Sequence, residues 1–204
     1  MRRTDMSPEQ RKRHVVDCAR ELFVRNGYAG TSTLSIAKAA DISEMTLFRY
    51  FPHKRDIFLY VIRPVLEVFT PETQRGTANV LSRSGLHGGE NLNTVEQVVW
   101  EFLQRKMRFI QNNRALLLLV LIESHLQPDL AGDFNPIVQV QTQLRVLLVT
   151  HGLNEEDASL AIRLMTGLLM STLFAPPDGE LDRKVAEQIF EMLKQIFRRG
   201  SAQE

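Results

Sequence analysis

Hydrophobic residues recur at helical spacing along most of this chain. The clearest stripe is Ile57, Phe58, Val61, Ile62, Val65, Leu66 and Phe69, with steps of three and one. This spacing gathers side chains on one face of an α-helix, so the sequence predicts a helix that begins at Lys54. Pro64 lies inside it, and its missing N–H is expected to bend or break the helix near Tyr60–Val61.

Capping residues divide the rest of the chain into further helices. Ser7 is a good N-cap, followed by Pro8 at the first helical position and Gln10 three residues after the cap, and Gly27 ends that helix. Residues 71–93 are rich in Gly, Ser and Asn and predict a long loop. Later helices are predicted over 94–112, 114–124, 135–151, 154–174 and 181–199. No convincing strand is seen, so the fold class is all-α, with about nine helices.

Residues 31–51 predict two short helices separated by a tight turn. Ser32, or alternatively Thr31, caps the first helix, and Ser43 caps the second. Asp41 lies where such a turn often needs left-handed geometry, which Asp tolerates better than most residues. The first helix has an apolar face made of Leu34, Ile36, Ala37 and Ala40. This arrangement is typical of a helix-turn-helix element, which presents its second helix to the DNA major groove.

The second short helix leaves a partly aromatic face uncovered. Leu47 and Phe51 are four residues apart and are expected to face the core. The outward side then consists of Glu44, Met45, Phe48 and Arg49, with Thr46 and Tyr50 at its margins. An ordinary solvated face carries Lys, Glu and Gln, so this pattern favours a reading surface over a plain helical hairpin.

These residues resemble the DNA-binding domain of bacterial TetR-type (TetR/AcrR) transcriptional regulators. The resemblance covers about Val15 to Val61 and rests on residues 29–40, Ile42-Ser43, 46–51, Lys54 and Phe58, with Leu22-Phe23 and Asn26-Gly27-Tyr28 before them. The rest of the chain is similar only in being helical. The resemblance implies a helix-turn-helix DNA-binding domain over 1–53 and a helical ligand-binding and dimerisation domain over 54–204.

The resemblance and the helical pattern together suggest roles for individual side chains. Phosphate contacts are expected from Thr33, Ser43, Thr46, Tyr50 and Lys54, and base contacts from Glu44, Met45 and Phe48, while Arg49 suits either role. Three residues depart from the family's pattern. Asp41 stands where Gly is usual, and Phe48 stands where Tyr is common. Glu44 is expected to be repelled by phosphates unless it accepts a hydrogen bond from a cytosine amino group.

The last two long helices carry more apolar surface than a monomer is expected to leave exposed. The predicted dimer interface includes Leu164, Gly167, Leu168, Ser171, Ile189, Leu193 and Ile196. Small residues permit close helix approach, and two copies are expected to form a four-helix interface about a two-fold axis. Each copy then places one reading helix on one half-site of the DNA, and the centres of the two half-sites lie about 34–36 Å apart. The alternative is that both helices are internal core of a monomer.

The middle helices carry bulky and polar residues suited to a ligand pocket. The candidates are Trp100, Gln104, Met107, His125, Gln139, Gln143 and Met165. Aromatic and Met residues at helical spacing are more often core, so the pocket rests mainly on the family resemblance. An apolar or amphipathic small molecule is favoured over a polyanion because this part of the chain is net acidic.

The distribution of charge along the chain supports a DNA-binding N-terminal part. Residues 1–60 hold 11 Lys and Arg against 7 Asp and Glu, whereas residues 61–204 hold 14 against 17, for a total of +1. The basic excess therefore lies in the part expected to meet phosphate. Arg2, Arg3, Arg11, Lys12 and Arg13 are either a solvated tail or an arm that reaches the DNA backbone or minor groove.

The sequence disfavours several classes of protein: disulfide-bonded, secreted, membrane-bound and catalytic. Cys18 is the single cysteine, so no intrachain disulfide forms, and its helical spacing indicates a small buried thiol rather than a redox sensor. No apolar run follows the basic start, so we expect no signal peptide, no membrane partner and a cytoplasmic location. The five histidines are scattered and no catalytic or metal motif is present, so we expect neither an enzyme nor a cofactor.

The sequence thus predicts a transcriptional regulator, most simply a repressor that binds a palindromic operator in double-stranded DNA as a homodimer. A small hydrophobic or amphipathic effector is expected to release it. The alternative is a helical DNA-binding or interaction protein that has no small-molecule effector.

Overall fold

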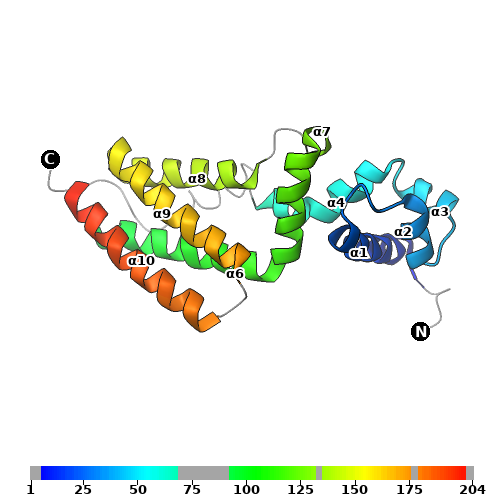
Figure 1. The fold of residues 1–204 in the computed structure, drawn as a ribbon, viewed down its shortest axis with the longest axis horizontal. Coiled ribbons are helices and arrows are strands. Elements are labelled where there is room, and N and C mark those ends of the chain that lie inside the picture. The colour runs from blue at the N-terminus through cyan, green and yellow to red at the C-terminus, as the bar shows by residue number, and fades with distance from the viewer. Residues whose placement is uncertain (1–5, 69–91, 132–134, 176–178, 201–204) are drawn as a thin grey trace. The chain divides into compact units, whose positions relative to one another are not determined.

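A computed structural model describes residues 6–68, 92–131, 135–175 and 179–200, and every regular element in these ranges is a helix (Figure 1). The all-α prediction is confirmed. The N-terminal helices are α1 (Pro8–Asn26), α2 (Thr33–Ala39), α3 (Glu44–Tyr50) and α4 (Lys54–Glu67). The later helices are α6 (Leu92–Leu126), α7 (Pro128–Ala131), α8 (Pro136–Thr150), α9 (Glu155–Phe174) and α10 (Gly179–Gly200). The loop predicted over 71–93 lies almost wholly outside the described residues.

The predicted caps define the N-terminal helices. The side chain of Ser7 accepts from the Gln10 N–H while the Gln10 side chain accepts from the Ser7 N–H, which satisfies two amide donors at the start of α1. Ser32, rather than Thr31, caps α2, and Ser43 caps α3. Asp41 adopts a φ of 53°, so the turn between these helices does use left-handed geometry.

Two predicted helix interruptions have different outcomes. Pro64 does not break α4, which continues to Glu67 with buried Ile62 and Val65 on either side of the proline, while a bend there stays a prediction. The break predicted near residue 113 is confirmed. Asn113 departs from helical geometry, with φ −124° and ψ 20°, and divides α6 into two helical portions.

The chain forms two compact units. The first contains residues 1–68 and 115–134, and the second contains residues 69–114 and 135–204. The predicted domain boundary between residues 53 and 54 does not coincide with these units, because α4 packs on α1 in the first unit. The separate functions assigned to 1–53 and 54–204 stay a prediction.

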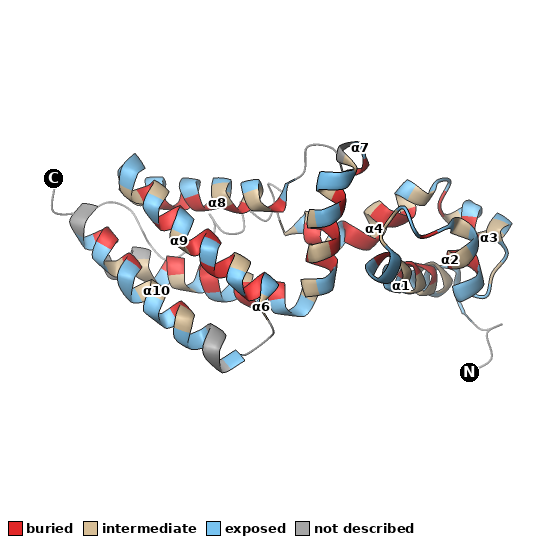
Figure 2. Cartoon of the chain, in the orientation of Figure 1, coloured by how far each residue is buried: buried red, intermediate tan, exposed pale blue. Residues whose placement is uncertain are grey.

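An aromatic cluster fills the core of the first unit. Phe23 and Phe58 are buried, and their ring centroids lie 5.4 Å apart, edge to face. Tyr28 packs on both rings, with centroid distances of 5.9 and 5.2 Å. Buried positions follow the inner faces of α1 and α4 in Figure 2. Leu34 was expected on the inner face of α2, but it is 49% exposed because Ile36 and Ala37 occupy that face.

The second unit is built around α9. Both α8 and α10 pack against it, and its inner face is formed by buried Met165, Leu169 and Leu173. The Arg114 side chain donates from Nε to the Leu173 carbonyl at 2.8 Å and from Nη2 to the Phe174 carbonyl at 3.3 Å. These bonds satisfy carbonyls that the helix end leaves without an intrahelical partner. By length and composition α9 would suffice to cross a membrane, but a half-buried core helix passes the same test.

Candidate DNA-reading surface

The short helix α3 presents the outward face that its sequence predicts. Leu47 is fully buried and Phe51 is 3% exposed, so these two side chains anchor α3 to the core. Met45 is 79% exposed and Phe48 is 43% exposed, and Arg49 is exposed beside them. Leaving large apolar side chains in water is unfavourable unless a partner covers them. We define the reading face as Glu44, Met45, Phe48 and Arg49.

Hydroxyl groups organise the first turn of α3. Ser43 Oγ accepts from the Thr46 N–H at 3.1 Å and lies 2.9 Å from Thr46 Oγ1. A second hydroxyl links α3 to α2, because Thr33 Oγ1 donates to Glu44 Oε1 at 2.5 Å. Thr33 and Glu44 are both half-buried. This bond turns the Glu44 carboxylate toward the start of α2 and fixes one of its two oxygens.

Lys54 has partners within the protein. Its Nζ donates to the carbonyls of Tyr28 at 2.9 Å and Thr31 at 3.0 Å, and it lies 4.2 Å from the centre of the Tyr28 ring. An ammonium group has three N–H donors, so one donor is left for a phosphate. The phosphate role of Lys54 stays a prediction. The structural role escaped the sequence argument because it depends on backbone carbonyls 23 and 26 residues away.

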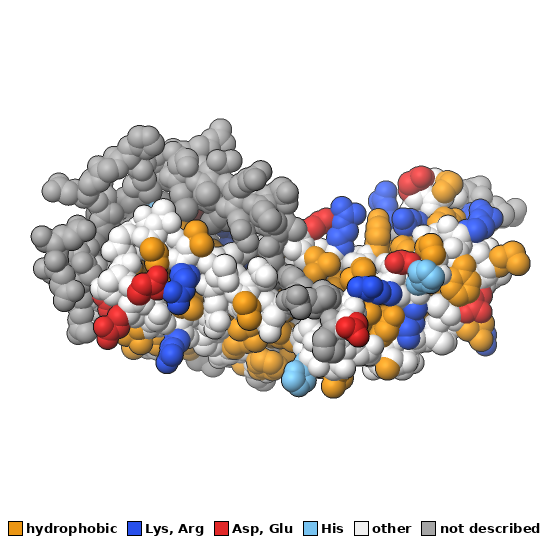
Figure 3. Space-filling model, turned by 90° about the horizontal axis from the view of Figure 1, so that it is seen from above, with side chains coloured by type: hydrophobic (Ala, Val, Ile, Leu, Met, Phe, Trp, Pro, Cys, Tyr) orange, Lys and Arg blue, Asp and Glu red, His pale blue; other side chains and the backbone are white. Residues whose placement is uncertain are grey.

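Cationic and apolar side chains alternate over the first unit, as the face drawn in Figure 3 shows. Lys12 Nζ lies over the rings of Phe51 and Tyr60, at 5.0 and 4.8 Å from their centres. Arg55 Nε donates to the Leu130 carbonyl at 3.2 Å. Lys12, one of the basic residues considered for a DNA-contacting arm, is therefore held against the core of the unit, whereas Arg2 and Arg3 lie outside the described residues.

Glu123 makes a long-range contact that its place in the sequence does not predict. Its carboxylate is 4% exposed, and Oε1 accepts from the Tyr28 N–H at 2.7 Å. A Glu in a long apolar helix gives no sign that its partner lies 95 residues earlier. Burial also raises the pKa of the neighbouring Tyr28 phenol, which keeps it uncharged.

The predicted dimer residues divide into buried and accessible sets. Leu168, Leu193 and Ile196 are 3, 0 and 7% exposed, because α9 and α10 bury them against the rest of their own unit. They have little surface left for a partner, in contrast to their predicted role. Leu164 and Ile189 are half-buried, and Gly167 and Ser171 are exposed. A methyl group added at Gly167 would meet nothing within 4 Å, so this side of α9 is open.

The predicted ligand residues do not line one described cavity. Met107 and Met165 are 7 and 0% exposed and belong to the core, whereas Gln104 and His125 are exposed. Trp100, Gln139 and Gln143 are half-buried, and the Trp100 ring packs 4.9 Å from Phe190. His125 belongs to the first unit and the other six residues to the second. Their roles in ligand binding stay predictions.

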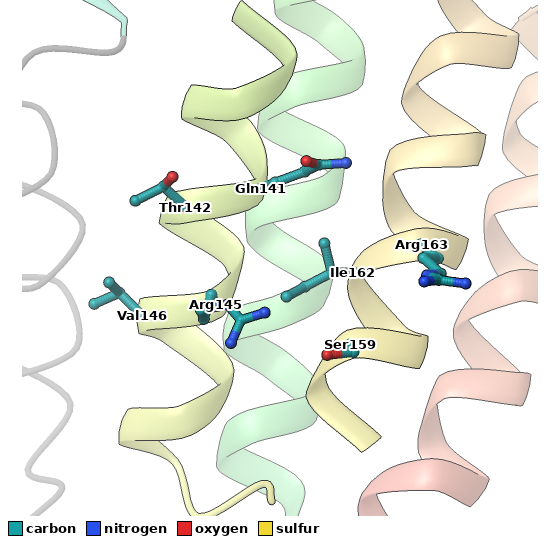
Figure 4. Close-up of a pocket in the computed structure, with 7 residues that line it drawn as sticks. All are labelled: Gln141, Thr142, Arg145, Val146, Ser159, Ile162 and Arg163. Carbon is teal, nitrogen blue, oxygen red and sulfur yellow. The ribbon is translucent and has the colours of Figure 1, made fainter. Parts of the chain in front are cut away.

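A groove of about 370 Å³ lies between α8 and α9 (Figure 4). It is lined by Gln141, Thr142, Arg145, Val146, Ser159, Ile162 and Arg163. Ile162 points from α9 toward α8, whereas Arg163 points to the other side of α9. Arg145 is paired with Glu155. The groove therefore mixes apolar and cationic side chains, and it contains none of the seven predicted residues.

Two further titratable groups have perturbed environments. Cys18 is half-buried rather than buried, with its Sγ 3.5 Å from the Ala39 carbonyl. Burial, together with Glu21 and Asp17, raises the pKa of this thiol, which disfavours the reactive thiolate. Burial and the nearby Arg105 lower the pKa of Lys106 to about 8. Among the described residues no cluster suited to a metal ion is found.

Residues 15–61 match the family model described as bacterial regulatory proteins of the tetR family. The chain is 28% identical over 112 residues to the HTH-type transcriptional regulator LuxR of Vibrio harveyi, covering 53% of this chain and 51% of that protein. It is 20% identical over 210 residues to AcrR of Shigella flexneri, covering 95 and 92% of the two chains. The chain thus spans about half the length of LuxR.

A solved structure of AibR in complex with isovaleryl coenzyme A and operator DNA has a similar fold. The TM-score is 0.58 at 18% identity, covering 90% of this chain and 97% of that chain. At this identity the likeness concerns the fold alone. The family match, by contrast, covers the same residues that form α3 and its surroundings.

Proposed function

We propose that this chain, whose residues 15–61 match the family model of bacterial tetR regulatory proteins, is a transcriptional repressor that binds a palindromic operator as a homodimer. A small hydrophobic or amphipathic effector releases it. The proposal depends most on the reading face of α3, where Met45 is 79% exposed although Leu47, two residues later, is fully buried as the anchor. A cytoplasmic location follows from this function.

In this proposal the reading face enters the major groove. Met45 and Phe48 contact thymine methyl groups, and Glu44 accepts from the amino group of a cytosine. The Thr33 bond supports this role, because it restrains the carboxylate before DNA arrives and reduces the entropy lost on binding. Ser43, Thr46, Tyr50 and the third N–H of Lys54 contact phosphates and position the helix.

Dimerisation uses the open side of α9 together with α10. Gly167 and Ser171 are small and exposed, and Leu160 and Met192 are 49 and 52% exposed. Small residues allow the helices of two copies to approach closely, and the larger apolar side chains then lose water. A pair of reading faces is needed because one short helix makes too few base contacts for specific binding.

The effector class is proposed from the composition of the second unit and from a neighbouring fold. The groove between α8 and α9 offers apolar Val146 and Ile162 beside cationic Arg145, which suits an amphipathic molecule. The AibR structure holds isovaleryl coenzyme A together with operator DNA, so a protein of this fold can bind both a small molecule and DNA. An effector releases DNA only to the extent that it binds the released state more tightly than the DNA-binding state.

The test is selection of DNA by the purified full-length chain from a random library, followed by titration of the selected sequence. We expect a palindromic sequence, one dimer bound to it, and affinity that falls steeply as salt increases. Light scattering or analytical ultracentrifugation gives the mass of the free protein. Recovery of no preferred sequence, or binding as a monomer to a single half-site, would contradict the proposal.

A further inference from the structure

The reading face of α3 places a hydrogen-bond acceptor beside two apolar side chains. Glu44 and Phe48 are four residues apart on this helix, so their Cβ atoms are neighbours at about 5–6 Å. Met45 follows Glu44 directly on the same face. Met45 and Phe48 are 79 and 43% exposed, whereas Glu44 is half-buried. The face therefore offers a carboxylate and an adjoining apolar surface to whatever molecule covers it.

Thr33 determines which oxygen of the Glu44 carboxylate is left for a partner. The Thr33 hydroxyl donates to Oε1 at 2.5 Å, and this bond joins the first turn of α2 to the first turn of α3. Within the described part of the chain, no donor is found on Oε2. A carboxylate only accepts hydrogen bonds, so Oε2 suits an N–H donor on a base rather than an acceptor.

The bases differ in what lies beside the donor on their major-groove edges. Cytosine presents its N4 amino group, and the next atom along that edge is C5, which is not polar. Adenine also presents an amino group, but its N7 acceptor lies beside it and repels a carboxylate. Thymine has a methyl group on C5, but its O4 acceptor lies beside that methyl group. A carboxylate next to an apolar surface therefore matches the cytosine edge best.

A methyl group on C5 of that cytosine completes the match. The edge then presents a donor to Glu44 and an apolar group to Phe48, with no acceptor near the carboxylate. A thymine on the next base pair also supplies a methyl group, but it brings its O4 acceptor toward the same carboxylate. We propose that the reading face recognises 5-methylcytosine in DNA. Glu44 binds the N4 amino group, and Phe48 covers the methyl group of this base in place of a thymine methyl group.

This inference rests on the proposed function, and its test uses the unaltered full-length protein with the DNA that it selects from an unmethylated library. Each cytosine of a half-site is replaced in turn by 5-methylcytosine in synthetic duplexes, and the dissociation constant is measured by fluorescence anisotropy. We expect one position at which the methyl group tightens binding about 4-fold, the effect of burying one such group. Methylation of the equivalent cytosine in both half-sites should tighten binding about 15-fold, because distant contacts add. The salt slope should not change, since no phosphate contact is gained.

Two variants assign the two contacts. Phe48→Ala should reduce the gain from the methyl group to less than about 2-fold, because the apolar cover is lost, while cytosine stays preferred over thymine at that position. Glu44→Gln should shift the preference at the same position toward adenine, because an amide side chain matches the N6 donor and N7 acceptor of adenine. Val24→Ala is the matched control. Val24 is 41% exposed on α1, outside the reading face, so this variant should keep the full gain.

The outcomes separate this inference from the proposed function. If the protein selects no DNA, the proposed function fails, and the inference fails with it. If the protein selects DNA but methylation of no cytosine tightens binding, the inference is overturned and the proposed function stands. Replacing thymine by uracil removes the thymine methyl group. If this replacement weakens binding, Phe48→Ala abolishes that effect and methylation gives no gain, Phe48 covers a thymine and the inference is likewise overturned. The duplexes are compared on the unaltered protein, so they decide even where a variant does not fold.

Discussion

Replacing Lys54 by Met separates its contacts inside the protein from its predicted contact with DNA. Lys54→Met keeps an apolar stem and removes the ammonium group that donates to the Tyr28 and Thr31 carbonyls. A hydrogen bond from a charged donor contributes about 1.5–3 kcal/mol. Because Lys54 is half-buried, water can replace part of these hydrogen bonds in the variant. We therefore expect the loss of both bonds to lower the free energy of unfolding by about 2–3 kcal/mol.

The assay is thermal unfolding followed by DNA titration at several salt concentrations. For a chain of this size, a loss of 2–3 kcal/mol corresponds to a fall in melting temperature of roughly 5–10 °C. Lys38→Met is the control, since Lys38 is exposed in the last turn of α2, and its effect should stay within about 0.5 kcal/mol. In DNA binding, Lys54→Met should weaken affinity for all sequences and reduce the salt slope by about 1.

Each half of this prediction has its own refutation. An unchanged melting temperature would mean that the two carbonyl contacts contribute little to folding. A salt slope equal to that of the unaltered protein would remove the phosphate role, and an altered sequence preference would mean that Lys54 acts near the bases.

Three other variants test the reading face, a buried cation and the dimer. Met45→Ala should change the selected DNA sequence more than the salt slope, and an unchanged selected sequence would refute its base contact. Lys106→Met should abolish a pH dependence of stability. Since the pKa of Lys106 falls to about 8 in the folded chain, the unfolded chain holds more protons between pH 8 and its ordinary value of 10.5, and stability rises with pH across that range. From pH 7 to pH 10 the urea midpoint of the unaltered protein should rise relative to that of Lys106→Met. Midpoints of the two proteins that change in parallel with pH would contradict this prediction. Met192→Glu places a charge on the exposed side of α10 and should shift the protein toward monomer in ultracentrifugation, whereas Glu187→Gln should not.

Local chemistry explains why the helix-turn-helix element is predictable from its residues. Ser32 and Ser43 cap helices because their hydroxyls reach backbone N–H groups three residues away, a contact that the sequence spacing alone defines. The same holds for the left-handed turn at Asp41 and for the alternation of buried Leu47 with exposed Met45. Capping and amphipathic spacing operate within one or two turns of helix, so the distant chain hardly affects them.

Helical spacing is less informative about which apolar face meets which neighbour. Leu168, Leu193 and Ile196 satisfy the pattern of an interface as well as that of a core, and the packing of α10 on α9 buries them within their own unit. Met107 and Met165 have a spacing that is more often that of a core than of a pocket, and both side chains are buried. Periodicity shows that a face is apolar, but the amount of water it loses depends on elements far along the chain.

The sequence by itself determined the helical class, the caps and the outward face of α3, because these depend on residues within a few positions of one another. Only the tertiary structure decided that Lys54 bonds backbone carbonyls near Gly27, and that Glu123 holds an amide 95 residues earlier. Such partners meet because the packing of α1, α4 and the end of α6 excludes water around them. A buried charge is stable only where that packing brings its hydrogen-bond partners within reach.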